Sequence, residues 1–95
     1  MPRYVRLIRY TEQGMKTLKN LNERLGNVKK VVESNGGKLI DSYVTLGRYD
    51  VISILEAPND DAAMKISVEI AAQGNLTAET LKAVRMQDFT KLVRK

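Results

Sequence analysis

The sequence predicts an α+β domain with a four-stranded antiparallel sheet and two helices on one face of that sheet. Three observations favour this class. Short runs rich in β-branched and aromatic residues, which are typical of strands, alternate with two longer segments whose apolar residues recur at helical spacing. The predicted order is strand, helix, strand, strand, helix, strand. A glycine-containing turn at residues 46–51 joins the two middle strands, as expected of a β-hairpin.

The chain is expected to form one domain, because 95 residues leave no room for two independent hydrophobic cores. We assign residues 1–95 to this single domain, with a core at about 3–86 and a C-terminal tail or short helix at 87–95. No apolar run approaches the ~20 residues needed to cross a bilayer. A strand pattern begins at once at the N-terminus, without the features of a signal peptide. We therefore expect a cytoplasmic protein.

The first half of the chain predicts a strand followed by a helix in two pieces. Residues 3–10 are rich in β-formers and predict the strand, and Thr11 is a good helix N-cap. Apolar residues then recur at spacings of three and four, which is the mark of an amphipathic helix. A pattern resembling a capping box begins at Asn20 and indicates a break there. We therefore expect a short piece at 12–19 and a longer one at 21–34.

The second half predicts a hairpin, a second helix and a last strand. The hairpin strands are expected at 38–46 and 50–57. The polar residues 59–61 cap a helix at 62–72, which is apolar around most of its circumference and is therefore expected to be buried on more than one side. The segment 76–86 could form a helix by propensity alone, but the topology favours a strand.

This order of elements leads to a specific fold. Two strand-helix-strand units with right-handed crossovers interlock into a four-stranded antiparallel sheet that carries both helices on one face. The arrangement is the ferredoxin-like βαββαβ fold. It places the first and third strands in the middle of the sheet.

The second face of the sheet is expected to need a cover of its own. In the first strand, Val5 and Leu7 suit a core face, but Tyr4 and Ile8 on the other face are also apolar, with Arg6 between them. A sheet with one solvated face should alternate cleanly between apolar and polar residues. Because this one does not, we expect another copy of the chain to cover the second face, giving a two-fold homodimer or a higher homo-oligomer.

Composition excludes several classes of function. The chain has no Cys and no His, so it has no thiolate metal site, no histidine haem ligand and no Ser-His-acid triad. We predict no metal and no cofactor. The net charge is +5, but residues 39–80 hold two basic and seven acidic residues. Aromatic residues are only 5% of the chain, which leaves little for base stacking, so we do not expect nucleic acid as a partner. No membrane partner is expected.

Several segments together resemble the GYD domain family, which is named for a Gly-x-Tyr-Asp pattern. That pattern occurs here within 46–51, and the resemblance extends to the strand start with Thr11-x-Gln13-Gly14, to Glu-Ala-Pro at 56–58 and to the run 74–83. It covers about residues 3–86. The family is similar to dimeric α/β-barrel proteins, which implies the fold and the homodimer. The wider superfamily includes cofactor-free monooxygenases, haem-using enzymes and ligand-sensing regulatory domains. Without His, the chain departs from the His-ligated haem members.

The candidate functional residues are polar groups around the hairpin turn and the last strand. Glu79 is the candidate catalytic residue, because an inward-facing carboxylate would have a raised pKa and could act as a general base. Thr77 shares its strand face. Arg6 is expected to face the dimer-covered side and to pair there with Asp41 or with Glu79. The ligand-binding candidates are Arg6, Tyr43, Arg48, Tyr49, Asp50, Asn75, Thr77 and Thr80.

These residues leave three functions open. We favour a homodimeric module that binds a small molecule or regulates a partner, with a pocket near the hairpin and residues 75–80. One alternative is a cofactor-independent oxygenase or isomerase of the dimeric α/β-barrel type, in which Glu79 or Asp50 with Tyr49 supplies the base. The other is a purely structural assembly subunit. Whether any reaction is catalysed stays open from the sequence, although a binding role is favoured over an enzyme.

Overall fold

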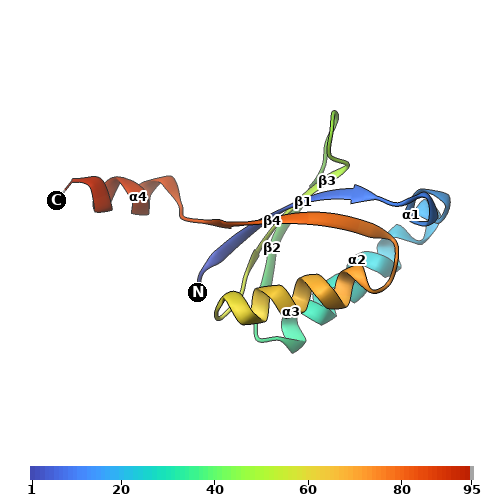
Figure 1. Ribbon diagram of the computed structural model, residues 1–95, viewed down its shortest axis with the longest axis horizontal. Coiled ribbons are helices and arrows are strands. Elements are labelled where there is room, and N and C mark those ends of the chain that lie inside the picture. Colours follow the sequence, from blue (N-terminus) through green and yellow to red (C-terminus); the bar gives the residue numbers. More distant parts are fainter. Residues whose placement is uncertain (95) are drawn as a thin grey trace.

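The structure is a computed structural model that describes residues 1–94, and it forms one sheet with helices packed on one side (Figure 1). The α+β class, the antiparallel sheet and the order of the main elements are confirmed. The elements are β1 (Arg3–Tyr10), α1 (Glu12–Lys16), the 3-10 turn η1 (Leu18–Asn20), α2 (Leu21–Ser34), β2 (Lys38–Val44), β3 (Val51–Glu56), α3 (Asp60–Ala71), β4 (Leu76–Ala83) and α4 (Met86–Val93).

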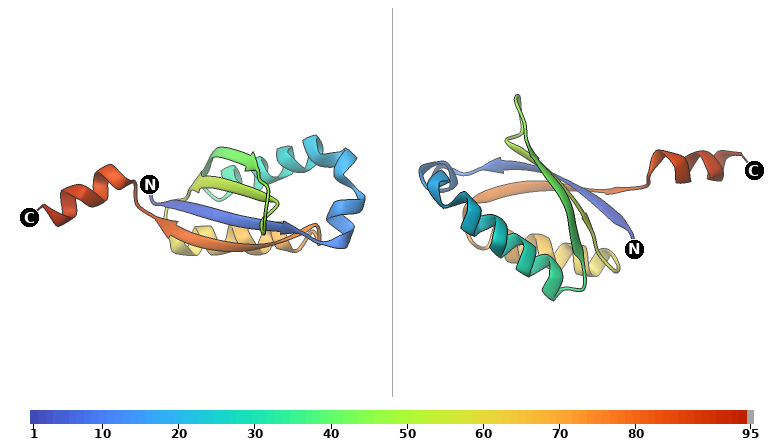
Figure 2. Two further views of the ribbon diagram at one scale, coloured as in Figure 1. Left: turned by 90° about the horizontal axis from the view of Figure 1, so that it is seen from above. Right: turned by 180° about the vertical axis from the view of Figure 1, so that it is seen from behind.

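The sheet has the strand order β2-β3-β1-β4, and every neighbouring pair is antiparallel. The first and third strands therefore lie in the middle, as the topology predicts. Helices α2 and α3 cover the same face of the sheet: they lie below it in the right view of Figure 2 and behind it in the left view. The other face carries no helix in the part of the chain that the structure describes.

The helix boundaries follow from local capping. The Thr11 side chain accepts a hydrogen bond from the Gly14 amide and caps α1. The expected break before residue 21 is present, because α1 ends at Lys16 and a 3-10 turn leads into α2. The Asn59 side chain caps α3 in the same way, by accepting a hydrogen bond from the Ala62 amide.

The C-terminal end differs from the prediction for 76–86. Strand β4 ends at Ala83, and a separate helix α4 starts at Met86. The reason is that Phe89, Leu92 and Val93 are spaced for one helix face, so the segment that begins at Met86 forms a helical turn rather than continuing as strand. Helix α4 extends away from the rest of the molecule (Figures 1 and 2).

The core lies between the sheet and the two long helices. Fully buried side chains come from β3 (Leu55), α2 (Val32) and α3 (Ile66, Ile70), and Tyr4 of β1 packs in the same cluster. The expectation that Val5 and Leu7 face this core is wrong, because both are only half-buried on the other face. Both faces of β1 are largely apolar, so the alternation alone could not identify the buried one.

The uncovered face is apolar at its centre. Across β1 and β3, Leu7 lies opposite Ile52 and Val5 lies opposite Ile54. All four are half-buried, although no helix covers them. Two further apolar side chains of this face are exposed, Tyr43 of β2 by 54% and Leu81 of β4 by 43%. We call this surface the open face. No helix within residues 1–94 is long and apolar enough to cross a membrane.

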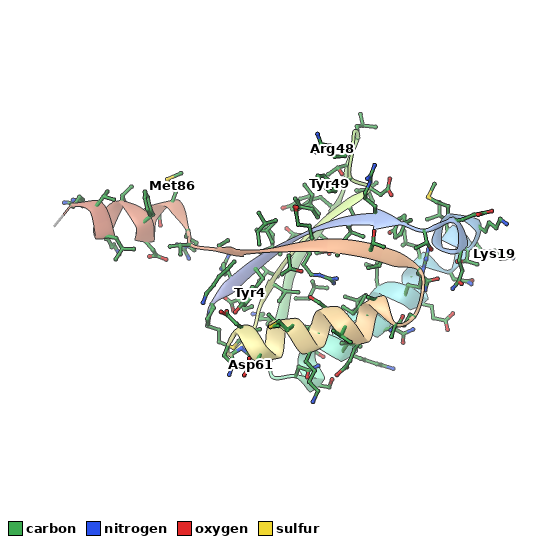
Figure 3. The ribbon with its side chains drawn as sticks, in the orientation of Figure 1. Tyr4, Lys19, Arg48, Tyr49, Asp61 and Met86 are labelled. Carbon is green, nitrogen blue, oxygen red and sulfur yellow. The ribbon has the colours of Figure 1, made fainter. Side chains whose placement is uncertain are left out.

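The turn between β2 and β3 projects beyond the sheet, and Figure 3 shows Arg48 and Tyr49 in it. Gly47 has φ +105° and no heavy atom within 4 Å of the place where a Cβ would sit. Backbone conformation rather than crowding therefore requires glycine here. The turn is closed by the Thr45 amide, which donates to the Asp50 carbonyl at 3.0 Å, and by the Thr45 hydroxyl, which donates to the Tyr49 carbonyl at 2.6 Å.

Candidate functional site

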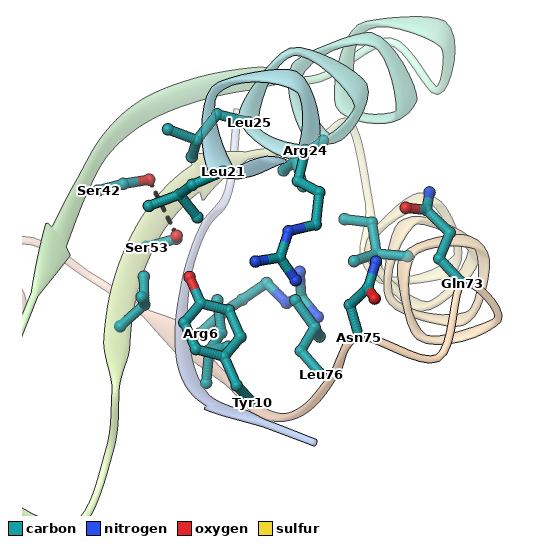
Figure 4. A pocket seen from close by; sticks show the side chains of 14 residues that line it. Arg6, Tyr10, Leu21, Arg24, Leu25, Ser42, Ser53, Gln73, Asn75 and Leu76 are labelled. Carbon is teal, nitrogen blue, oxygen red and sulfur yellow. Dashed lines mark hydrogen bonds between the residues drawn. The ribbon is translucent and has the colours of Figure 1, made fainter. Parts of the chain in front are cut away.

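A cavity of about 50 Å³ lies between the sheet and the start of α2 (Figure 4). It is the best candidate site, because it combines apolar walls with a few polar groups, as ligand sites do. Three sides of it come from β1, from α2 and from the loop that connects α3 to β4. Its polar lining residues are Arg6, Tyr10, Arg24, Ser42, Ser53, Gln73 and Asn75.

Arg6 is the central polar residue of this cavity. Its side chain lies on the helix-covered face of β1, and the residue is only 2% exposed. The Nε atom is buried without a hydrogen-bond partner among residues 1–94. Burial lowers the pKa of Arg6, but an arginine stays protonated in proteins. The cavity therefore contains a positive charge that no carboxylate in its lining compensates.

The expected pairing of Arg6 with Asp41 or Glu79 is not formed. Glu79 lies opposite Leu7, and Asp41 lies opposite Ile54, so both belong to the open face. Arg6 lies opposite Ser53 and Thr80, on the other side of the sheet. Strand alternation thus puts the two carboxylates and the guanidinium on opposite faces.

Arg24 enters the same cavity from α2. Its Nη2 atom donates to the carbonyls of Gly14 at 3.1 Å and Thr17 at 3.3 Å, which ties α2 to the short helix α1. The guanidinium carbon lies 5.2 Å from the ring centre of Tyr10, a cation–π distance. The Nε and Nη1 atoms of Arg24 are buried without partners among residues 1–94. A second guanidinium therefore faces the cavity with unused hydrogen-bond donors.

Arg24 was missed by the reasoning from sequence, although a signal existed. Leu21, Arg24, Leu25 and Val28 follow the i, i+3, i+4, i+7 pattern of one helix face. A charged residue inside an apolar stripe is either buried with a partner or part of a site. The many surface lysines of the same helix concealed this one position.

Hydroxyl and amide groups line the rest of the cavity. The Ser42 and Ser53 hydroxyls lie 3.0 Å apart across β2 and β3. The pKa of Tyr10 is raised mainly by burial, while nearby Arg24 acts in the opposite direction. Asn75 is fixed by Gln13, whose side-chain amide donates to Asn75 Oδ1 at 3.1 Å. These groups can orient a polar ligand, but no described carboxylate in the lining can serve as a base.

Comparison with known proteins now places the chain in a family. A family model, the GYD domain, matches residues 4–93. The chain belongs to the GYD domain family. A Thermus thermophilus protein described as a "glutamine synthetase and cystathionine beta-lyase binding protein" is 28% identical over 90 residues, which is 94% of this chain and 95% of that protein.

A solved structure supports the fold of this GYD domain. The crystal structure of TTHA0845 from Thermus thermophilus superimposes with a TM-score of 0.58 and 17% sequence identity. The match covers 90% of this chain and 95% of that one. At this identity the likeness concerns the fold alone, and it agrees with the ferredoxin-like arrangement.

The turn that gives the GYD family its name has a structural role here. Asp50 Oδ2 accepts a hydrogen bond from the Tyr10 amide at 2.8 Å, and the Asp50 amide donates to the Ile8 carbonyl at 2.8 Å. Asp50 thereby fastens the hairpin to the end of β1. Arg48 is exposed and Tyr49 is half-buried at this turn, and neither lines the cavity.

Of the other predicted residues, Arg48, Asp50 and Thr77 line an open hollow beside the hairpin turn, and the rest are spread over the domain. Arg6 and Asn75 are the two that the structure brings together in the cavity. The Thr80 hydroxyl lies 3.3 Å from that of Ser67 on α3. On the open face, the Tyr43 hydroxyl donates to Asp41 at 2.6 Å. The two remaining candidates, Thr77 and Glu79, are exposed on β4.

A second polar cluster, at the start of α3, is structural. The Tyr4 hydroxyl donates to Asp60 Oδ1 at 2.5 Å, and Lys82 Nζ lies 3.0 Å from the same oxygen. The hydrogen bond to Asp60, with burial, raises the pKa of Tyr4 to about 12. The same hydrogen bond, with that of Lys82, lowers the pKa of Asp60. The cluster joins β1, β4 and the N-terminus of α3, where a carboxylate is favourable. Among residues 1–94 no group of three acidic residues could hold a metal ion.

Proposed function

We propose that this GYD domain is a small-molecule-binding regulatory module that works as a homodimer. The observation that carries the proposal is the cavity with the buried Arg6, whose Nε atom has no partner in the described chain. Burying an uncompensated charge costs stability. A ligand that enters the cavity would offset this cost, so a binding role explains a feature that packing alone does not.

The homodimer is supported by the open face. Val5, Leu7, Ile52 and Ile54 form a contiguous apolar centre on a face that no helix among residues 1–94 covers. Contiguous apolar surfaces of this kind mark interaction sites in soluble proteins. A two-fold axis would pack the open face of one protomer on that of its partner, sheet against sheet.

An enzymatic function has less support. Glu79, the best candidate base, is exposed on the open face rather than in the cavity. Tyr10 does line the cavity, but its raised pKa keeps it protonated near neutral pH. A cofactor-independent oxygenase or isomerase needs a base within hydrogen-bond reach of its substrate. The purely structural alternative leaves the buried guanidinium of Arg6 without a physical reason.

Native mass spectrometry with light scattering tests the proposal directly. The protein should run at twice its 10.7 kDa chain mass at micromolar concentration, and freshly purified protein should retain a small molecule. Denaturing the same sample should release that molecule for identification. A ligand-free monomer that stays ligand-free after incubation with a metabolite extract would argue against both parts of the proposal.

A second candidate function is binding to a metabolic enzyme. One relative is described as binding glutamine synthetase and cystathionine β-lyase, and α4 offers a surface for a similar contact. Helix α4 carries Phe89, Leu92 and Val93 at 51–62% exposure, and residues 81–95 hold five basic residues and one acidic residue. An apolar stripe with basic flanks suits an acidic enzyme surface.

Surface plasmon resonance with the two purified enzymes from the same organism would test this contact. The double substitution Phe89→Ser and Leu92→Ser should reduce binding at least tenfold, since both side chains are exposed on α4. Lys29→Ser, at an exposed position of α2 away from this surface, is the matched control and should bind like wild type. Binding that survives the double substitution would assign the contact to another surface.

A further inference from the structure

We propose that the ligand of the cavity is a small aliphatic carboxylate, with its carboxylate group held by Arg6 and Arg24. This inference rests on the proposed function of the cavity and adds the chemical class of the ligand. It starts from an imbalance of charge, because two guanidinium groups line the cavity and no carboxylate does.

Arg6 supplies the strongest argument. The residue is 2% exposed, and its Nε has no partner among residues 1–94. A buried charge in a protein is ordinarily paired or hydrogen-bonded. The three salt bridges of the described chain involve neither Arg6 nor Arg24. The missing partner of Arg6 is therefore expected to be an anion that comes from outside the chain.

Arg24 completes the site from the opposite wall. Figure 4 shows its side chain reaching from α2 toward the strands, near Tyr10 and Asn75. Its Nη2 is held by two backbone carbonyls, which fixes the guanidinium plane and leaves Nε and Nη1 buried without partners in the described chain. Nε and Nη1 lie on different edges of the guanidinium, so this preorganised group can donate a hydrogen bond from one of them to one carboxylate oxygen, and the second oxygen is left for Arg6.

The walls of the cavity define the rest of the ligand. They are mostly apolar, and the side chains that contribute are Ile8, Leu21, Leu25, Val28, Ile70 and Leu76. A volume of about 50 Å³ holds roughly four water-sized groups. A hydrocarbon chain of two or three carbons next to the carboxylate fits this space and these walls. A phosphate dianion would leave most of its oxygens facing apolar side chains, so a carboxylate is favoured.

The first experiment compares ligands with the wild-type protein. Thermal unfolding is followed with acetate, propionate, butyrate, inorganic phosphate and the uncharged analogue propionamide, at constant ionic strength. Propionate or butyrate should raise the melting temperature in a saturable way, because a ligand that binds only the folded state stabilises it. Phosphate and propionamide should have at least tenfold weaker effects.

The second experiment tests the residues. Arg6→Met removes the buried charge and keeps much of the side-chain volume, so without ligand the protein should be as stable as wild type or more stable. Isothermal titration should show butyrate binding at least tenfold weaker. Lys29→Met removes an exposed charge from α2 and should bind like wild type. If Arg6→Met does not fold, Arg24→Met provides the same comparison at a less buried position.

The outcomes separate this inference from the proposed function. Equal binding of butyrate and propionamide would overturn the carboxylate assignment and leave a ligand-binding cavity. Saturable binding of phosphate without binding of butyrate would also overturn the carboxylate assignment and leave a ligand-binding cavity. Butyrate binding that is unchanged by Arg6→Met and by Arg24→Met would place the ligand elsewhere. If no ligand of any class binds, and native mass spectrometry finds none retained, the proposed function fails together with the inference.

Discussion

Replacing Asp50 with alanine tests whether the turn of the GYD domain is a structural fastening. Asp50 Oδ2 accepts a hydrogen bond from the Tyr10 amide at 2.8 Å, between the hairpin and the end of β1. Hydrogen bonds to charged groups contribute about 1.5–3 kcal/mol. Because Asp50 is only half-buried, solvent can replace part of this contact in the variant. We therefore expect Asp50→Ala to lower the free energy of unfolding by about 1–2 kcal/mol.

Urea denaturation at one fixed protein concentration measures this change, since the stability of a dimer depends on concentration. The midpoint should fall by roughly 0.5–1 M with an unchanged slope, because small proteins lose about 1–3 kcal/mol per molar urea. Asp50→Asn keeps an oxygen acceptor, so its free energy of unfolding should fall by about half as much as that of Asp50→Ala. Arg48→Ala, in the same turn but exposed, should stay within about 0.5 kcal/mol of wild type.

Two results would refute this reasoning. If Asp50→Ala unfolds at the wild-type midpoint, the hydrogen bond to Tyr10 does not stabilise the hairpin. If Asp50→Ala keeps its stability but loses butyrate binding, the motif carboxylate acts on the ligand rather than on the fold. The structure favours neither result, because Asp50 does not line the cavity.

Three further predictions follow from other contacts. Gly14→Ala should destabilise the protein by roughly 1–3 kcal/mol in thermal or urea unfolding. The reason is that an added Cβ collides with the backbone carbonyl of Asn75, and a backbone group cannot move aside as a flexible side chain can. Tyr4→Phe should flatten the pH dependence of unfolding at both ends. The pKa of Tyr4 is raised to about 12, so its contribution to the free energy of unfolding is complete below pH 10 and is lost as the pH rises toward 12. The pKa of Asp60 is lowered, so its contribution is lost as the pH falls through the range of that carboxyl. A wild-type pH profile in Tyr4→Phe would contradict this reasoning. Ile52→Glu places a charge in the centre of the open face and should convert a homodimer into a monomer in light scattering, whereas a dimer that persists would place the interface elsewhere.

The sequence was sufficient for the four strands, the two long helices and their order, because the relevant signals are local. Thr11 and Asn59 are caps that act within one turn, and Gly47 needs a positive φ that few other residues adopt. The sheet order then follows from connection rules that hold for most proteins. These features depend on neighbouring residues or on general rules of topology, so they can be predicted from the amino-acid sequence alone.

The site could be predicted only in part, because it depends on which strand face is buried. Both faces of β1 are largely apolar, so nothing in the pattern favours Tyr4, Arg6 and Ile8 over Val5 and Leu7. The choice is made by α2 and α3, which pack against the face that carries Tyr4 and Ile8. The pattern therefore predicts Arg6 beside Asp41 or Glu79, whereas the structure places Arg6 on the opposite face of the sheet.

The cavity and the open face share one wall, and this relates the two proposals physically. Along β1, Arg6 lines the cavity while its neighbours Val5 and Leu7 point to the open face. Along β3, Ser53 lines the cavity in the same way, while its neighbours Ile52 and Ile54 point to the open face. The two central strands would therefore contact a ligand on one side and a second protomer on the other. A regulatory module needs such a common element. Ligand binding and dimerisation influence each other only if both sites contact an element that has two alternative states, and if each partner binds the two states with different affinity.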